Sequence, residues 1–133
     1  MNDRPTNIEL LEAVRHFLET DVVPALDGPK KFHARVAANV MNILSREWQL
    51  EEEHDRAEWQ SLTALLGEKG SPPVKRAEAH TAMRELTERL CERIRNGDAD
   101  EGPLRAEVLR HLRLVVRQKL EVATPAMLEA DRR

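Results

Sequence analysis

Hydrophobic residues recur at helical spacing along most of the chain, in stretches separated by proline, glycine and acidic residues. Near the N-terminus, Thr6 and Glu9 form a capping box ahead of an apolar stripe, which predicts a helix over residues 7–21. Pro24 and the glycine turn after it are expected to end this helix. No stretch shows the sustained period-two alternation of a half-buried strand. The pattern therefore predicts an all-α fold.

Four further helices follow from the same pattern. The second is expected over residues 29–50, and the acidic residues 51–53 suit the first turn of a third. Further helix starts are predicted at Ser71, with Pro72 and Pro73 in the first turn, and at Pro103. Helix ends are predicted at Gly67, Gly97 and Pro125. Helices of this length with short connections predict an antiparallel bundle of about five helices. We expect a single domain over residues 1–133, with frayed ends at about 1–5 and 126–133.

The second helix carries its polar residues in an unusual place. Its polar stripe recurs at spacings of 4, 3 and 4 and occupies a band of about 60°. This stripe consists of Arg35, Asn39, Asn42 and Arg46. The rest of the helix is apolar or small almost all round, which predicts a central helix of the bundle. The last helix is expected to turn a core face inward that comprises Val108, Leu112, Val115, Val116 and Leu120.

The polar stripe admits two interpretations. In one it is an internal network, with Arg35 paired to a buried carboxylate. In the other it lines a groove or a docking face for another molecule. We expect the buried pair for Arg35, whereas Arg46, nearer the end of its helix, is expected to reach solvent more readily.

Composition and charge exclude several classes of function. The formal net charge of −3 and the 3% of aromatic residues argue against a general nucleic-acid binder. Cys91 is the only cysteine, so an internal disulfide and a cysteine-based zinc cluster are excluded. The scattered histidines form no zinc motif, and no cofactor fingerprint is present, so we expect neither a metal nor a cofactor. Without a leader or a long apolar run, a cytoplasmic protein with no membrane contact is expected.

Three arginines recur on one face of the last predicted helix. Arg110, Arg113 and Arg117 are separated by three and four residues, which places their guanidinium groups side by side. A solvated face is the plainer interpretation of such a charge run. The alternative is a dock for a phosphate-bearing ligand or an acidic partner.

Four segments of the chain resemble a bacterial family of small proteins classed as a domain of unknown function. They are "ELLEAVRHFLETDVVPAL", "FHARVAANVMNI", "LCERIRNG" and "LRHLRLVVRQKLEV". The resemblance covers residues 7–125, and "FHARVAAN" is its most specific part. Phe32, His33, Arg35, Val36 and Asn39 fall on the family's signature. Members are commonly encoded beside aminoglycoside-phosphotransferase-like kinases and acyl-CoA dehydrogenases.

The resemblance implies association and not chemistry. It predicts a non-catalytic accessory subunit of an aminoglycoside-phosphotransferase-like kinase that acts on hydroxyacyl-CoA substrates, with an acyl-CoA dehydrogenase as a further partner. The expected binding residues are Phe32, His33, Arg35, Asn39, Asn42 and Arg46, with Arg110, Arg113 and Arg117 for a ligand or partner. The alternative is a carrier or sensor that binds an acyl-CoA in the bundle. A homo-oligomer is compatible with either role.

Overall fold

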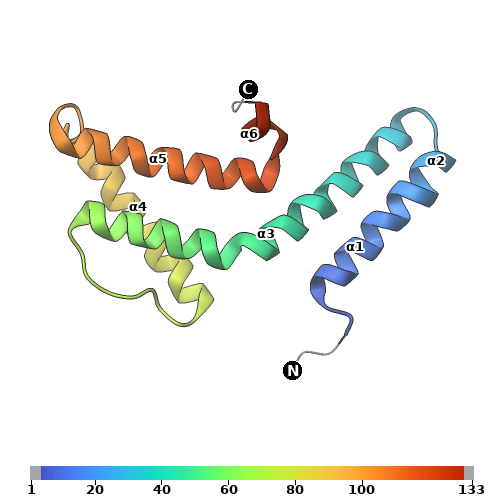
Figure 1. Cartoon of the computed structure of the whole chain (residues 1–133), viewed down its shortest axis with the longest axis horizontal. Coiled ribbons are helices and arrows are strands. Elements are labelled where there is room, and N and C mark those ends of the chain that lie inside the picture. Colours follow the sequence, from blue (N-terminus) through green and yellow to red (C-terminus); the bar gives the residue numbers. More distant parts are fainter. Residues whose placement is uncertain (1–3, 131–133) are drawn as a thin grey trace. The chain divides into compact units, whose positions relative to one another are not determined.

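The computed structural model describes residues 4–130 as helices joined by turns and one longer loop (Figure 1). In chain order the elements are α1 (Asn7–Phe17), the π-helix η1 (Leu18–Val22), α2 (Val23–Ala25), α3 (Gly28–Leu66), α4 (Arg76–Arg95), α5 (Gly102–Ala123) and α6 (Ala126–Ala130). The predicted all-α fold is confirmed, since the described residues contain no strand. The chain divides into two compact units, the first formed by Met1–Glu51 with Glu121–Arg133 and the second by Glu52–Leu120. The expectation of one domain over residues 1–133 stays a prediction.

The N-terminal helix begins at the predicted capping box and runs further than its sequence suggested. The Glu9 amide donates to Thr6 Oγ1 at 3.2 Å, and the Thr6 amide donates to Glu9 Oε2 at 2.7 Å. After α1 the chain widens into η1 and then continues through α2. Pro24 does not break the helix as expected, because it stands in the first turn of α2, where its missing amide hydrogen matters least. The predicted frayed residues Met1–Asp3 lie outside the described part of the chain.

α3 is one helix of 39 residues, about 58 Å long, where the sequence predicted two. The expected break at residues 50–51 is absent because no proline or glycine interrupts residues 30–66. An exposed pair between Arg56 Nη2 and Glu52 Oε1, 2.7 Å apart, bridges one turn just beyond this point. The predicted end at Gly67 is confirmed, with this residue in the left-handed region at φ +68°.

The first unit packs α1, η1 and α2 against the N-terminal half of α3 (Figure 1). Its buried hydrophobic residues are two alanines of α3, Ala34 and Ala38, within the described part of the unit. Alanine lets two helices approach closely, so the small-residue side of α3 is the buried one. Five large apolar residues of the same half are between 41% and 64% exposed, namely Phe32, Val36, Val40, Leu44 and Trp48, whereas Met41 and Ile43 are partly buried. The central place of this helix in a bundle stays a prediction.

The second unit holds the larger core. The C-terminal half of α3, α4 and α5 converge on a cluster made of Leu62, Leu65, Leu86, Leu90 and Val108. Leu62 is fully buried, and Trp59, Met83 and Leu104 pack around the cluster. The indole Nε1 of Trp59 also donates to the carbonyl oxygen of Gly70 at 3.2 Å, which ties the loop after α3 to that helix.

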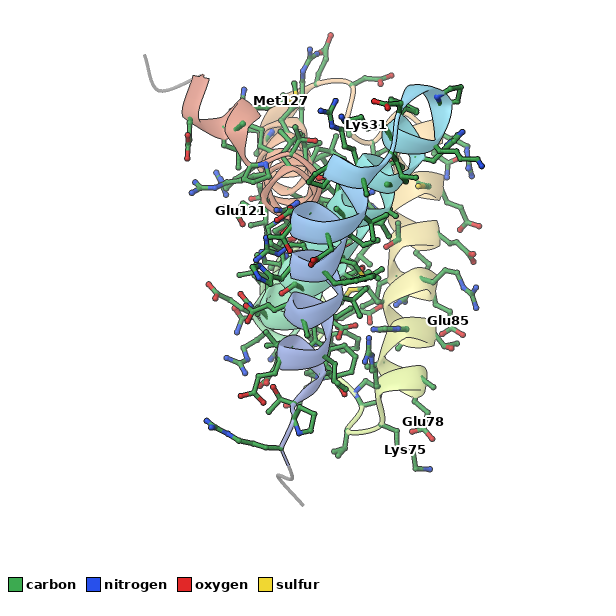
Figure 2. The ribbon with its side chains drawn as sticks, turned by 90° about the vertical axis from the view of Figure 1, so that its right-hand side faces the viewer. Lys31, Lys75, Glu78, Glu85, Glu121 and Met127 are labelled. Carbon is green, nitrogen blue, oxygen red and sulfur yellow. The ribbon has the colours of Figure 1, made fainter. Side chains whose placement is uncertain are left out.

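α4 begins later than predicted. It starts at Arg76 after Lys75, and Ser71, Pro72 and Pro73 lie in the preceding loop. A proline disfavours helical geometry in the residue before it, so Ser71 and Pro72 are poorly suited to begin the helix. The exposed pair Lys75–Glu78, 3.0 Å apart, marks the first turn of α4 (Figure 2). Its predicted end at Gly97 is confirmed.

The inward face of α5 differs from the predicted one. Val108 is buried as expected, but Leu112 and Val116 are 45% and 55% exposed. The side chains of His111 and Gln118 are buried instead, because both find hydrogen-bond partners on α3. After α5 ends near Pro125, the short helix α6 occupies residues that were expected to fray. The predicted frayed residues 131–133 lie outside the described part of the chain.

Candidate docking site

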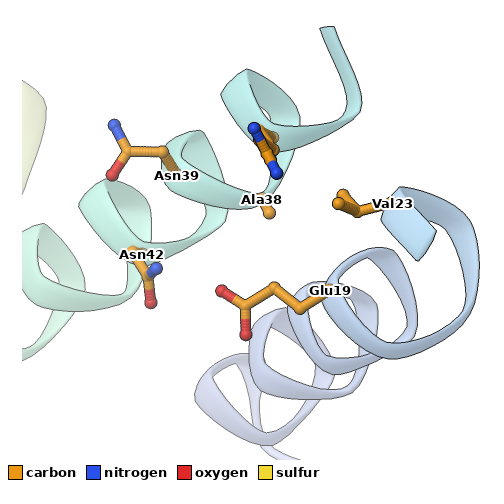
Figure 3. Close-up of a pocket in the computed structure, with 6 residues that line it drawn as sticks. Glu19, Val23, Ala38, Asn39 and Asn42 are labelled. Carbon is orange, nitrogen blue, oxygen red and sulfur yellow. The ribbon is translucent and has the colours of Figure 1, made fainter. Parts of the chain in front are cut away.

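The structure brings three residues of the polar stripe together in one open pocket of about 300 Å³ within the first unit (Figure 3). Arg35, Asn39 and Asn42 line it from α3. Across from them, Glu19 of η1 and Val23 of α2 complete its wall, and Ala38 forms its floor. The pocket is therefore built where the widened end of the N-terminal helix faces α3.

The side chain of Arg35 is exposed, and the predicted buried ion pair is wrong. α1 packs on the side of α3 that carries Ala34 and Ala38, and Arg35 lies to one side of that contact. Among residues 4–130, neither its guanidinium nor the amides of Asn39 and Asn42 have a hydrogen-bond or ion-pair partner. These groups are free to bind another molecule.

Arg46, the fourth residue of the stripe, has a different role. Its Nε donates to the carbonyl oxygen of Val122 at 2.7 Å, and its side chain is half-buried. The expectation that Arg46 reaches solvent more readily than Arg35 is wrong, because the end of α5 covers Arg46. This hydrogen bond satisfies a carbonyl in the last turn of α5, which lacks an intrahelical partner. Arg46 therefore fastens the C-terminal segment to α3.

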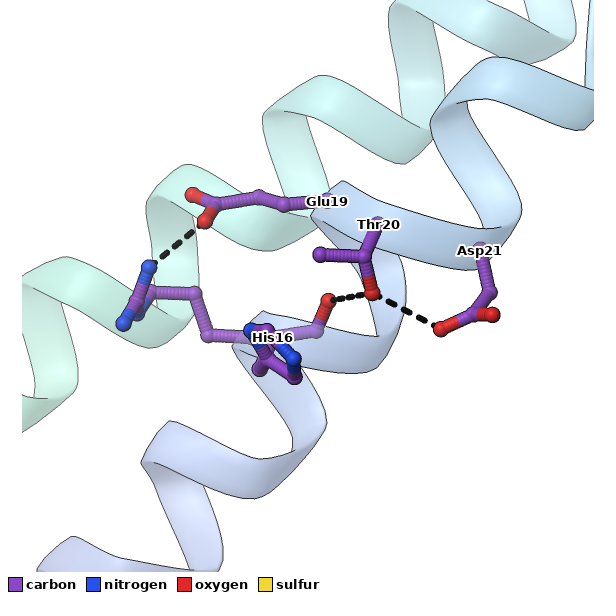
Figure 4. A network of polar contacts seen from close by, with 5 residues as sticks. His16, Glu19, Thr20 and Asp21 are labelled. Carbon is purple, nitrogen blue, oxygen red and sulfur yellow. Dashed lines mark hydrogen bonds and ion pairs between the residues drawn. The ribbon is translucent and has the colours of Figure 1, made fainter.

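Glu19 lies in the π-helix, where a neighbouring arginine holds its side chain. Arg15 Nη1 contacts Glu19 Oε2 at 2.5 Å, one turn earlier on the same helix (Figure 4). The Thr20 hydroxyl lies 2.8 Å from the His16 carbonyl oxygen and 2.7 Å from Asp21 Oδ2. Such π-helical turns occur mostly as single turns within α-helices and are frequent at functional sites. Because Arg15 already neutralises Glu19, the charge of Arg35 is left for a partner.

The other predicted binding residues lie outside this pocket. Phe32 and His33 are exposed on α3, and their rings meet edge to face with centroids 5.7 Å apart. All three arginines of α5 that were expected to bind a ligand or partner are exposed. These are Arg110, Arg113 and Arg117.

Two buried polar pairs join α3 to α5 in the second unit, and the sequence analysis missed both. His111 Nδ1 lies 2.9 Å from Ser61 Oγ, and Gln118 Nε2 donates to the His54 carbonyl oxygen at 3.2 Å. The two pairs are seven residues apart on both helices, as two antiparallel helices in contact require. Because one of the acceptors on α3 is a backbone carbonyl, the only signal in the sequence was the seven-residue interval between His111 and Gln118.

Burial changes the acidity of two groups in this unit. It lowers the pKa of His111, whose side chain is only 4% exposed, and keeps the imidazole neutral. Although a serine and a histidine are in contact here, burial between two helices keeps the imidazole from a substrate. Burial also raises the pKa of Glu58, and the neighbouring carboxylate of Asp55 raises it further. We interpret these groups as parts of the helix interface.

Comparison with known proteins gives one match. The family model described as Domain of unknown function (DUF6285) matches residues 24–127, which include α3 to α5 and the polar stripe. No curated protein and no solved structure matches the chain. Among the described residues, no helix has the length and apolarity required to cross a bilayer.

Proposed function

We propose that this chain, which belongs to the family described as Domain of unknown function (DUF6285), is an accessory subunit of an aminoglycoside-phosphotransferase-like kinase. The kinase would act on hydroxyacyl-CoA substrates, and an acyl-CoA dehydrogenase is the further partner that the family resemblance implies. In this proposal the chain binds its partner and leaves the chemistry to it. The site is the pocket formed by the polar stripe.

The observation that carries the proposal is the free hydrogen-bonding capacity of the pocket. A guanidinium and two amides from one helix face an open space without a partner among residues 4–130. Such groups in solvent contribute little to folding, but their planar geometry suits a carboxylate or a peptide backbone on a docked protein. Arginine is also enriched among the residues that dominate binding energy at interfaces.

Co-purification tests the proposal directly. The full chain is produced together with an aminoglycoside-phosphotransferase-like kinase, and we expect a stable complex in the absence of any CoA ester. Arg35→Ala should weaken the complex by about 2 kcal/mol or more, roughly 30-fold. Arg35→Lys keeps the charge without the planar fork and should fall between. Arg84→Ala, which removes an exposed arginine of α4, is the matched control and should bind normally.

Direct binding of a CoA ester by the isolated chain would favour the alternative function, a carrier or sensor of acyl-CoA. The exposure of all three α5 arginines supports this alternative, since their guanidinium groups could reach the phosphates of the ligand. Calorimetric titration of the pure chain with an acyl-CoA measures it. No binding of the kinase, together with CoA-ester binding lost in Arg113→Ala, would replace the first proposal by the second.

A further inference from the structure

Five exposed apolar residues follow each other at every fourth position of α3. We call Phe32, Val36, Val40, Leu44 and Trp48 the apolar ridge. They are 64%, 44%, 41%, 41% and 51% exposed, whereas Ala38 of the same helix is 3% exposed. At about 100° per residue, Val36 and Val40 lie across the helix from Ala34 and Ala38. On α3 the first unit thus buries two small residues and leaves the five residues of the apolar ridge exposed.

We infer that the apolar ridge is the interface with a second copy of this chain. The order of residues along the ridge supports this occupant, because it is nearly the same in both directions. Read from Val40 toward either end, an aliphatic residue comes first and an aromatic residue second. In an antiparallel pair with its two-fold axis at Val40, Val36 meets Leu44 and Phe32 meets Trp48. Such self-complementarity is what an isologous dimer requires.

Helix packing gives this pair a defined geometry. Residues spaced by four form a ridge inclined to the helix axis, and two such ridges run parallel to each other at the contact when the helices cross at about −50°. Crossed helices are closest at the centre and diverge toward their ends. Val40 at the centre is the smaller side chain that close approach needs. The aromatic rings of Phe32 and Trp48, about 24 Å apart along the helix, can fill the widening gap at either end.

Area and charge agree with a second copy. Half-exposed side chains of this size offer on the order of 450 Å² from the five ridge residues together. A standard interface buries about 800 Å² per partner, so the ridge supplies its apolar centre and flanking residues supply the rim. The same two-fold axis places the imidazole of His33 against the carboxylate of Glu47, both exposed on α3. Opposite ends of the ridge therefore carry complementary groups.

Light scattering on the full chain after gel filtration tests the inference. We expect twice the chain mass of 15.2 kDa at micromolar concentration. Val40→Glu places two carboxylates at the two-fold axis and should raise the dissociation constant by about 100-fold or more, since like charges in contact oppose association. Val116→Glu makes the same change at an exposed valine of α5 (55% against 41% for Val40) and should leave the dimer intact. Circular dichroism checks that both variants remain folded.

Cysteine cross-linking tests the antiparallel register in a Cys91→Ser background. Val40→Cys should link to itself, because a residue on the two-fold axis faces its own copy within disulfide distance. Chains with Phe32→Cys should link to chains with Trp48→Cys and not to one another. A bridging reagent of short reach reports both reactions on a denaturing gel.

A monomer at all concentrations would overturn the inference, as would a dimer that Val40→Glu leaves unchanged. Self-linking of Phe32→Cys without linking to Trp48→Cys would exclude the antiparallel register. A monomer that loses kinase binding in Val40→Glu would assign the ridge to the kinase instead. The co-purification with Arg35→Ala described above gives a separate answer for the polar pocket.

Discussion

Arg46 and Arg35 belong to one stripe on one helix, and we expect their removal to have different consequences for stability. Arg46→Ala deletes the donor of a 2.7 Å hydrogen bond to the Val122 carbonyl. It leaves that carbonyl near the end of α5 without a protein partner, and it loosens the contact between α3 and the C-terminal segment. Arg35→Ala removes an exposed side chain without a partner among residues 4–130.

The magnitude follows from the kind of bond and its burial. A hydrogen bond to a charged group contributes about 1.5–3 kcal/mol net when it is buried. The Arg46 side chain is half-buried, so water competes for both groups and the lower end, about 1.5 kcal/mol, applies. For a chain of this size the loss corresponds to a melting temperature lower by about 5 °C. Arg35→Ala should change the free energy of unfolding by about 0.5 kcal/mol or less.

Urea denaturation followed by far-UV circular dichroism compares the two variants under identical conditions. Limited proteolysis adds a local measurement, since Arg46→Ala should expose the end of α5 to cleavage earlier than Arg35→Ala does. Equal stability of the two variants would refute the reasoning, because it would mean that the hydrogen bond to Val122 contributes nothing. A larger loss for Arg35→Ala would restore the buried network that the sequence suggested.

Three further predictions concern the second unit. Leu62→Ala should lower the free energy of unfolding by about 2–5 kcal/mol because its side chain is fully buried. Leu112→Ala, at a half-exposed position, should lower it by less than about 1 kcal/mol. Similar urea midpoints for the two variants would contradict the proposed core. The raised pKa of Glu58 means that its ionisation disfavours the folded state as the pH rises above the unfolded pKa of about 4.5. Glu58→Gln should therefore be more stable than the natural chain at pH 7 and lose that advantage below pH 4.5. A Glu58→Gln variant that is less stable at pH 7 would disprove this. The lowered pKa of His111 means that unfolding takes up a proton once the pH falls below about 6.5. The stability of His111→Gln should therefore decline less steeply on acidification than that of the natural chain. Parallel pH profiles of the two proteins would show that His111 does not titrate on unfolding.

Local sequence signals predicted where several helices begin and end. The capping box at Thr6 and the glycines 67 and 97 act through backbone geometry within one turn, so they depend little on the rest of the fold. The helix break that we predicted near residue 51 is wrong, because its signal was a preference and not a requirement. Acidic residues favour a helix start without requiring one, and nothing between residues 30 and 66 prevents a helix from continuing.

The sequence grouped three of the six residues that line the pocket and did not predict their environment. The spacing of Arg35, Asn39 and Asn42 placed them on one face of a helix, and the structure brings them into one pocket. Periodicity could not tell which face of that helix packs against α1, because both the alanine side and the valine side are apolar. Nor could it find Glu19, which lies in the π-helix on the other side of the pocket. Contacts between segments far apart in the chain decide both.

The continuity of α3 through residues 51 and 52 gives the chain a built-in spectroscopic experiment. Trp48 belongs to the first unit and Trp59 to the second, and these are the only two tryptophans of a chain without tyrosine. In Trp59→Phe the emission reports the first unit, and in Trp48→Phe it reports the second. Because a single helix is common to both, its cooperativity can carry unfolding from one unit into the other. Coincident fluorescence transitions would then show that the two units unfold together through the shared helix. Separate transitions would show that the helix unfolds at a point between them.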